Sequence, residues 1–260
     1  YADPVLIVQV HQAEQLTPEL AQLCPAYVYV PVEILDTAFA RLAPFLEQGT
    51  QVVAVLPRVI TDDQAEDMHA MLSRAAENGV REALVGNMGH IFFARRAGMH
   101  VRGDFGLNVF NSYTEGVLQQ AGLVSATASF ELRVAQIRDL AKAVDTEMIV
   151  YGRLPLMIFE NCAIRRQHGG KCSCQNGVTY LTDRRRERFP LLNEFGCRNT
   201  LLNSRPLCLR EDFARLGVQT ARLQFTIESP EECVRIARAF LSGAPLDGEF
   251  TNGLYKRGVE

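Results

Sequence analysis

The chain has 260 residues, of which 47% are hydrophobic and 22% charged, and its formal net charge is −3. This composition is ordinary for a globular protein and excludes a disordered chain, a collagen-like repeat and a coiled coil. No apolar run approaches the roughly 18 residues of a membrane-spanning helix, so we expect no membrane partner.

Short apolar runs alternate with longer stretches of helical spacing along the chain. The predicted strands are residues 5–10, 26–31, 51–57, 82–86, 100–104, 123–129, 147–151 and 221–226. The predicted helices are a stretch ending at residue 23, then residues 33–47, 62–78, 89–97, 112–121, 131–144 and 230–242. Eight strand–helix units predict a (β/α)8 barrel of the TIM type, with an open parallel α/β sheet as the alternative.

We expect one barrel domain over residues 1–260, with residues 153–219 inserted as a loop after the seventh strand. Loops of that length carry function or small structures of their own. Residues 178–183 and 189–192 resemble the two strands of a hairpin within this loop. Because the chain opens with Tyr-Ala-Asp-Pro and without methionine, we also expect a fragment whose partners include other domains of a longer protein.

The inserted loop differs from the rest of the chain in charge. Residues 151–210 hold 11 Lys and Arg against 4 Asp and Glu, whereas the remainder holds 16 against 26. Such a basic segment predicts RNA or another anionic partner, and the alternative is a solvated surface loop. The candidate RNA contacts are Arg184, Arg185, Arg186 and Arg188.

Five of the seven cysteines lie in the same loop. Thiolates that gather in this way bind a soft metal or an iron–sulfur cluster, although small buried side chains are the alternative. The irregular spacing suits a [4Fe–4S] cluster at least as well as zinc, which usually has two short Cys pairs. The predicted ligands are Cys162, Cys172, Cys174 and Cys197, with Cys208 or His168 as substitutes. An odd number of cysteines over a long chain also favours a reducing compartment, so we expect a cytoplasmic protein.

Polar side chains follow several predicted strands, at the face where TIM barrels build their sites. His11, Glu131 and Glu228 suit proton transfer, and Arg153 suits binding of a carboxylate or phosphate. Each of them could instead be a helix cap or a loop hydrogen-bonding group. The candidate catalytic residues are His11, Asp104, Asn108, Glu131, Arg153 and Glu228.

Motifs over residues 100–260 resemble those of one known family. They are Asp104, LNVFNS at 107–112, YGRLPLM at 151–157, ENC at 160–162, DR at 183–184, FP at 189–190, CR at 197–198, NSRPL at 203–207 and GLYKRG at 253–258. This pattern is similar to the collagenase-like peptidases of unknown catalytic type, family U-32, in the C-terminal barrel portion of its long members. The close Cys172–Cys174 pair is a departure from the family.

The resemblance implies two activities. The family is named for collagen degradation, whereas other members are oxygen-independent hydroxylation proteins for RNA or ubiquinone precursors, with a [4Fe–4S] cluster on four cysteines. We therefore expect a U-32-type, peptidase-like protein that uses a metal or cluster in redox modification of RNA or a small aromatic substrate. The alternatives are a proteolytic enzyme with structural zinc and a non-catalytic, substrate-recruiting barrel. Motifs of serine hydrolases, zinc proteases, P-loop proteins and dinucleotide enzymes are absent from the sequence.

Overall fold

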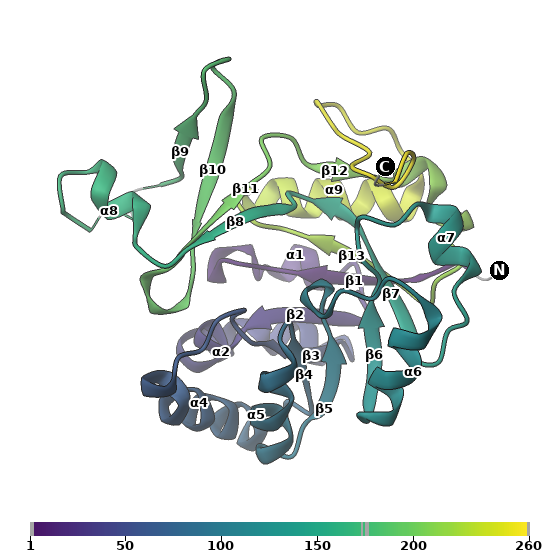
Figure 1. The fold of residues 1–260 in the computed structure, drawn as a ribbon, viewed down its shortest axis with the longest axis horizontal. Helices are drawn as coiled ribbons and strands as arrows, with labels where there is room; N and C mark the ends of the chain where they lie inside the picture. Colours follow the sequence, from purple (N-terminus) through teal and green to yellow (C-terminus); the bar gives the residue numbers. More distant parts are fainter. Residues whose placement is uncertain (1–2, 173, 175–176, 259–260) are drawn as a thin grey trace.

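Eight parallel strands close into a barrel (Figure 1). The computed structural model describes residues 3–172, 174 and 177–258. Neighbouring strands pair in chain order, and the pairings of β6 with β7 and of β13 with β1 close the ring. The barrel strands are β1 (Val5–Gln9), β2 (Tyr27–Pro31), β3 (Gln51–Val55), β4 (Glu82–Val85), β5 (His100–Gly103), β6 (Leu123–Thr127), β7 (Asp145–Gly152) and β13 (Thr220–Gln224). The predicted (β/α)8 barrel is confirmed, and the closing pairs exclude the open sheet.

The strands read as nearly continuous apolar runs because both of their faces are buried. Outward-facing residues such as Val8, Val28 and Val30 pack under the helices in the main core. A second, small apolar cluster consists of Ile7, Tyr29, Val53 and Leu84. It fills one part of the barrel interior, and charged side chains fill another.

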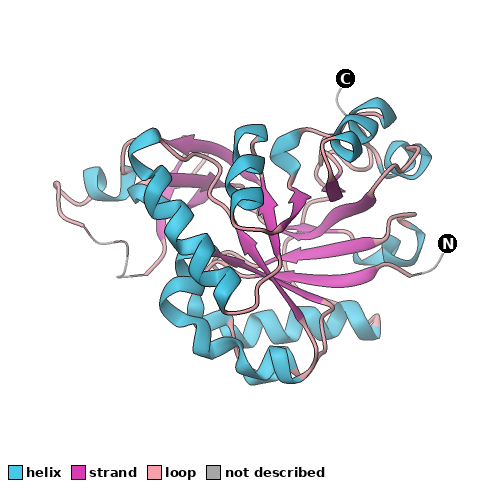
Figure 2. Ribbon diagram, turned by 90° about the horizontal axis from the view of Figure 1, so that it is seen from below, coloured by secondary structure: helices cyan, strands magenta, loops and turns pink. Residues whose placement is uncertain are grey.

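Helices surround the strands on the outside (Figure 2). They are α1 (Pro18–Ala21), α2 (Val32–Ala38), α3 (Ala43–Glu47), α4 (Ala65–Glu77), α5 (Ile91–Arg96), α6 (Ser112–Gln120), α7 (Val134–Asp139) and α9 (Pro230–Ser242). Local signals set several of their ends. Ser229 and Glu232 form a capping box at the start of α9, and the Asn111 side chain caps α6.

Two predicted helices differ from the structure. Residues 33–47 form α2 and α3 with a 3-10 turn, η2 (Phe39–Leu42), between them, and Pro44 lies in the first turn of α3. Proline has no N–H to donate, so it starts a new helix more readily than it continues an old one. The predicted helix 131–144 is reduced to the six residues of α7.

The segment after β7 forms a second, four-stranded antiparallel sheet (Figure 1). We call it the inserted sheet, and its order is β8 (Pro155–Phe159), β11 (Asn199–Leu202), β10 (Arg188–Asn193), β9 (Thr179–Thr182). A short helix, α8 (Ala163–Gln167), lies between β8 and β9, and β12 (Leu207–Cys208) returns to pair with β7. The expected hairpin exists as β9 and β10. Among the described residues, no helix combines the length and the apolar character needed to cross a membrane.

Candidate active site and cysteine group

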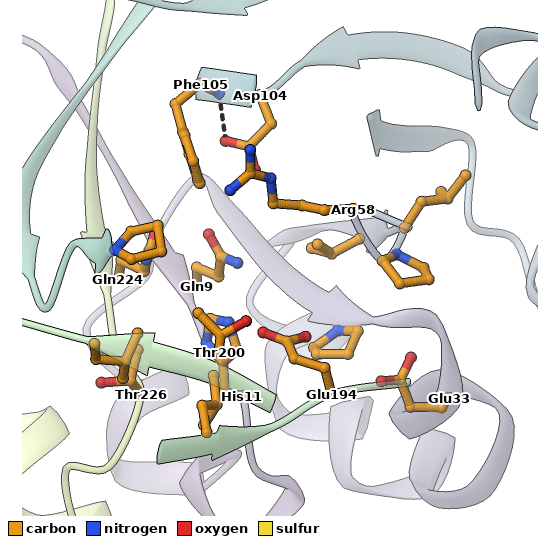
Figure 3. Close-up of a pocket in the computed structure, with 17 residues that line it drawn as sticks. Gln9, His11, Glu33, Arg58, Asp104, Phe105, Glu194, Thr200, Gln224 and Thr226 are labelled. Atoms are coloured by element: carbon orange, nitrogen blue, oxygen red, sulfur yellow. Dashed lines mark hydrogen bonds between the residues drawn. The ribbon is translucent and has the colours of Figure 1, made fainter. Parts of the chain in front are cut away.

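A cavity of about 60 Å³ that opens to solvent lies where the barrel meets the inserted sheet (Figure 3). It opens at the carboxyl ends of the barrel strands, where residues such as His11, Glu33, Arg58 and Asp104 follow β1, β2, β3 and β5. The inserted sheet supplies the opposite wall, with Pro155, Leu192, Glu194, Thr200 and Leu202. We call this the mouth cavity. Both the barrel and the insertion are needed to enclose it.

Two carboxyl groups of the mouth cavity have perturbed acidities. Burial raises the pKa of Glu33 to about 7, and the negative charge of Glu194 adds to this effect. Burial also raises the pKa of Glu194, although a hydrogen bond with Thr200 and the charge of Arg58 oppose it. Near neutral pH, Glu33 therefore exchanges a proton readily. A carboxyl group of this kind suits general acid–base catalysis.

His11 contributes an uncharged imidazole to the same cavity. Its Nδ1 lies 2.7 Å from the carbonyl oxygen of Phe225, which fixes Nδ1 as the protonated nitrogen and leaves Nε2 with a lone pair. Burial lowers the pKa of His11. The ring is thus a neutral hydrogen-bond acceptor and a candidate base.

A charged network below the cavity holds Asp104. Arg222 is completely buried, and its Nη2 donates to Asp104 Oδ1 at 2.6 Å, while its Nη1 donates to Gln9 Oε1 at 2.7 Å. Its Nε lies 2.8 Å from Glu147 Oε1. Asp104 Oδ1 also accepts the backbone N–H of Phe105 at 2.8 Å (Figure 3). Asp104 is therefore oriented before any ligand binds.

The network continues through the barrel interior. The Tyr29 hydroxyl donates to Glu147 Oε2 at 2.6 Å and accepts from Arg102 Nε at 2.9 Å, and Arg102 Nη1 donates to Glu82 Oε2 at 2.8 Å. Burial, followed by the charge of Glu147, raises the pKa of Tyr29, which stays protonated. Buried charges of this number cost stability unless each has partners, and barrels usually fill this space with aliphatic side chains. Here each of these charged side chains has a partner of opposite charge.

The structure places the six candidate catalytic residues in different surroundings. His11 and Asp104 line the mouth cavity. The remaining four do not line it. Glu228 is buried behind it, where Oε2 accepts the N–H of Thr226 at 2.6 Å. Arg153 Nη1 donates to the carbonyls of Asn203 and Ser204. Asn108 is an exposed residue with a φ of 54°, and Glu131 is also exposed. The catalytic roles of all six remain predictions.

Several cavity residues were absent from the sequence-based set. Glu33 and Arg58 directly follow the second and third strands, so the strand-end rule that selected His11 could have found them. Glu194 could not have been found in this way, because it belongs to the inserted sheet and reaches the cavity only through tertiary packing. Gln224 lies within β13, where its sequence position resembles an ordinary core position.

The four predicted thiol ligands, Cys162, Cys172, Cys174 and Cys197, lie toward one end of the inserted sheet. We call them the cysteine group. Cys172 Sγ and Cys174 Sγ are 3.6 Å apart, and Cys197 is close enough that its charge contributes to raising the pKa of Cys174. Phe159 at the end of β8 pairs with Asn199 at the start of β11, so Cys162 and Cys197 both lie just beyond that end of the ladder. Within the described residues, no three His, Cys, Asp or Glu side chains are already arranged around a common metal position.

The two substitute ligands lie differently. His168 ends the α8 region, with Nδ1 2.9 Å from the Ile164 carbonyl oxygen. Cys208 pairs with Tyr151 on β7, in the barrel sheet and not in the inserted sheet. Cys208 is therefore poorly placed to complete the cysteine group.

The four arginines predicted to contact RNA lie on the β9–β10 hairpin. Asp183 Oδ1 accepts the N–H groups of Arg185 and Glu187, which fixes a tight turn with Arg184, Arg185 and Arg186 at its tip. Arg188 stacks on Tyr180 with its guanidinium carbon 4.0 Å from the ring centre. The hairpin projects away from the barrel (Figure 1). All four arginines are exposed.

Fold and site together define a TIM barrel whose mouth is covered by an inserted antiparallel sheet that also carries a cysteine group. The chain belongs to peptidase family U32, whose family model matches residues 36–242. The resemblance seen in the sequence motifs is thereby confirmed.

The solved structure of the U32 peptidase Mk0906 is similar to this chain with a TM-score of 0.53 and 13% sequence identity, covering 88% of this chain and 96% of the other. A mutant of FabK from Thermotoga maritima matches with a TM-score of 0.43 and 9% identity, covering 94% and 92%. At these identities the likeness to Mk0906 concerns the fold alone. No curated protein sequence matches the chain.

Proposed function

We propose that the chain is an enzyme with its active site in the mouth cavity, and that its cysteine group binds a [4Fe–4S] cluster or another metal for redox modification, such as hydroxylation, of RNA or a small aromatic substrate. The observation that carries the proposal is the position of Cys197. It is three residues from Glu194, so the same short turn, η6 (Phe195–Cys197), joins the cysteine group to the cavity wall.

The thiols are suited to a thiolate-bound metal. Two thiolates bound to one tetrahedral metal at about 2.3 Å would stand roughly 3.8 Å apart, close to the 3.6 Å between Cys172 and Cys174. Cys197 lies near Cys174, and the hydrogen bond from Ile164 N to Asn199 Oδ1 at 3.1 Å ties α8, which follows Cys162, to β11. The Cys172–Cys174 spacing therefore suits a single metal ion, whereas a [4Fe–4S] cluster would require these two thiolates to move apart, since each would bind a different iron, and would require Cys162 and Cys197 to approach them. An iron–sulfur cluster would supply one-electron transfer, whereas zinc would be structural.

The cavity and the hairpin are suited to the proposed substrates. Phe105 and Leu56 provide apolar walls for a ring, while Glu33 and His11 provide groups that exchange protons. The exposed arginines of the hairpin could bind phosphates, and Tyr180 could stack on a base. The thiols of Cys24, Cys162, Cys172, Cys174, Cys197 and Cys233 are free, which is consistent with a reducing compartment, and we propose the cytoplasm.

Metal and sulfide analysis of anaerobically purified protein tests this proposal. We expect iron with equivalent sulfide, lost in Cys162→Ala and Cys197→Ala and retained in Cys24→Ala, a matched control on an exposed thiol outside the inserted sheet. Zinc without sulfide, or metal that survives both substitutions, would overturn the proposed redox role.

A second candidate function is peptide hydrolysis, and the pair Glu33 and Glu194 favours it. One protonated and one ionised carboxyl group in a cavity can activate water for attack on an amide carbonyl and then protonate the leaving amine. Hydrolysis of gelatin by metal-free protein, abolished in both Glu33→Gln and Glu194→Gln, would support this function. RNA binding that weakens with salt and is not followed by turnover would instead indicate a non-catalytic barrel that recruits substrate.

A further inference from the structure

The mouth cavity contains hydrogen-bond acceptors that no described residue satisfies. Gln224 is 5% exposed and lines the cavity, yet its Oε1 is buried without a hydrogen-bond partner. Glu33 Oε2 is likewise buried without a partner. Each such group costs stability comparable to a lost hydrogen bond. Two of them in one cavity indicate that a ligand supplies the missing donors.

Three further side chains facing this space are acceptors, and Gln9, Thr200 and Thr226, which can also donate, complete its polar lining. His11 Nε2 is an acceptor because Nδ1 is bound to the Phe225 carbonyl oxygen, and Glu194 adds a second carboxyl group. Asp104 is held by Arg222. Among the described residues that line the cavity, Arg58 alone is a strong cation, and it is exposed and stacked at 5.1 Å over the Phe105 ring. The cavity therefore favours a positively charged donor group.

A metal ion is the obvious competitor for these acceptors. However, no group of three His, Cys, Asp or Glu side chains is arranged to hold one anywhere in the described ranges. About half of the wall is also apolar, since prolines and branched aliphatic side chains lie among the acceptors. The apolar lining consists of Pro31, Val55, Leu56, Pro57, Phe105, Pro155, Leu192 and Leu202. Such walls suit the carbon body of an organic ligand and not a hydrated ion.

We propose that the mouth cavity binds an organic ammonium group, a protonated amine on an apolar body, with Glu33 and Glu194 as its acceptors at one end of the cavity, whereas Gln224 lies at the other end (Figure 3). This proposal rests on the proposed function only in placing substrate in the same cavity. An ammonium group brings three donors and no acceptor, which matches the unsatisfied side of the cavity. The apolar body would lie against the Phe105 side.

The test compares benzylamine with benzyl alcohol, a neutral ligand of nearly the same shape, by calorimetry or NMR titration. At pH 8 we expect benzylamine to bind at least about tenfold more tightly than benzyl alcohol, since a charge-assisted hydrogen bond is worth this much. The preference should fall at pH 5.5, where Glu33 is protonated. Arg58 stays charged over this range, and protonation of Glu194, whose pKa burial also raises, or of His11 would act in the same direction.

Two variants locate the effect. Glu33→Gln and Glu194→Gln should each lower the preference at pH 8 and weaken its pH dependence. Glu47→Gln, on an exposed residue of α3, should bind as the unaltered protein does. Equal binding of the two ligands, unchanged binding in Glu33→Gln, or displacement of benzylamine by millimolar Mg²⁺ would overturn the proposal.

Metal and sulfide are measured in the same preparations, so the two proposals fail separately. Protein that binds benzylamine but contains no metal would retain the ammonium site and lose the redox function. Protein that contains a cluster and shows no preference for benzylamine would retain the redox function and lose the ammonium site.

Discussion

The Glu33→Gln variant should be more stable than the unaltered protein at alkaline pH and equally stable in acid. The native pKa of Glu33 is raised from 4.5 to about 7 because the side chain is buried near Glu194. Between these pH values the native state binds more protons than the unfolded chain does, so the free energy of unfolding falls as the pH rises through this window.

The magnitude follows from the size of the pKa change. The pKa of Glu33 rises by about 2.5, and each pKa unit corresponds to 1.36 kcal/mol. Above pH 7 the ionised Glu33 therefore lowers the free energy of unfolding by about 3 kcal/mol. Glutamine has nearly the same shape and never ionises, so it removes this cost. The variant should therefore gain up to about 3 kcal/mol at pH 8, and this gain should vanish near pH 4.5.

Urea unfolding of the two proteins across this pH range measures the difference directly, because all other titrating groups are common to both. Glu47→Gln serves as the control for loss of an exposed carboxylate. A stability difference that does not change with pH, or a variant less stable at pH 8, would refute the assigned burial of Glu33.

Three further substitutions test the framework around the site. Glu147→Gln should lower the free energy of unfolding in urea by about 1.5 to 3 kcal/mol, because it removes one of the two carboxylate partners of buried Arg222 and leaves only Asp104; a loss below about 1 kcal/mol would contradict the network. Gly152→Ala should lower the thermal midpoint and weaken benzylamine binding, since φ is 135° and a Cβ would collide with the Gln224 carbonyl oxygen; unchanged values would contradict that contact. Ser229→Ala should cost about 1 kcal/mol by removing the cap of α9, and an unchanged midpoint in urea would argue against the capping box.

The barrel could be predicted from the sequence because its signals are local. Each strand is a short apolar run buried on both faces, as in β1 and β3, and each is followed by a helix or turn with recognisable ends. Eight repetitions of this pattern leave few other topologies. The apolar residues keep helical spacing through Pro44, so the sequence predicts one continuous helix. The backbone instead forms α2 and α3 with the 3-10 turn η2 between them.

The site could be predicted only in part, and for a physical reason. His11 and Asp104 follow strands, and strand ends in a parallel barrel meet at one face whatever the rest of the chain does. Glu194 reaches the cavity because the inserted sheet folds over the barrel, and no local pattern encodes that docking. The raised pKa of Glu33 likewise depends on burial by residues distant in sequence.

The cysteine group shows the same limit. Its members could be chosen from composition, and the β8–β11 register explains why Cys162 and Cys197 come together. The spacing alone did not indicate which cysteine belongs elsewhere. Cys208 pairs with β7 in the barrel sheet, which only the topology reveals.

The central claim is that a redox group on the cysteines serves the mouth cavity, and a redox titration followed by visible absorption tests it most directly. At pH 9 we predict a reducible chromophore whose midpoint potential is higher in Glu194→Gln than in the unaltered protein, because removing a nearby negative charge favours the reduced state. Glu47→Gln should leave the potential unchanged. The absence of a reducible chromophore, or a potential that does not respond to Glu194→Gln, would contradict the account.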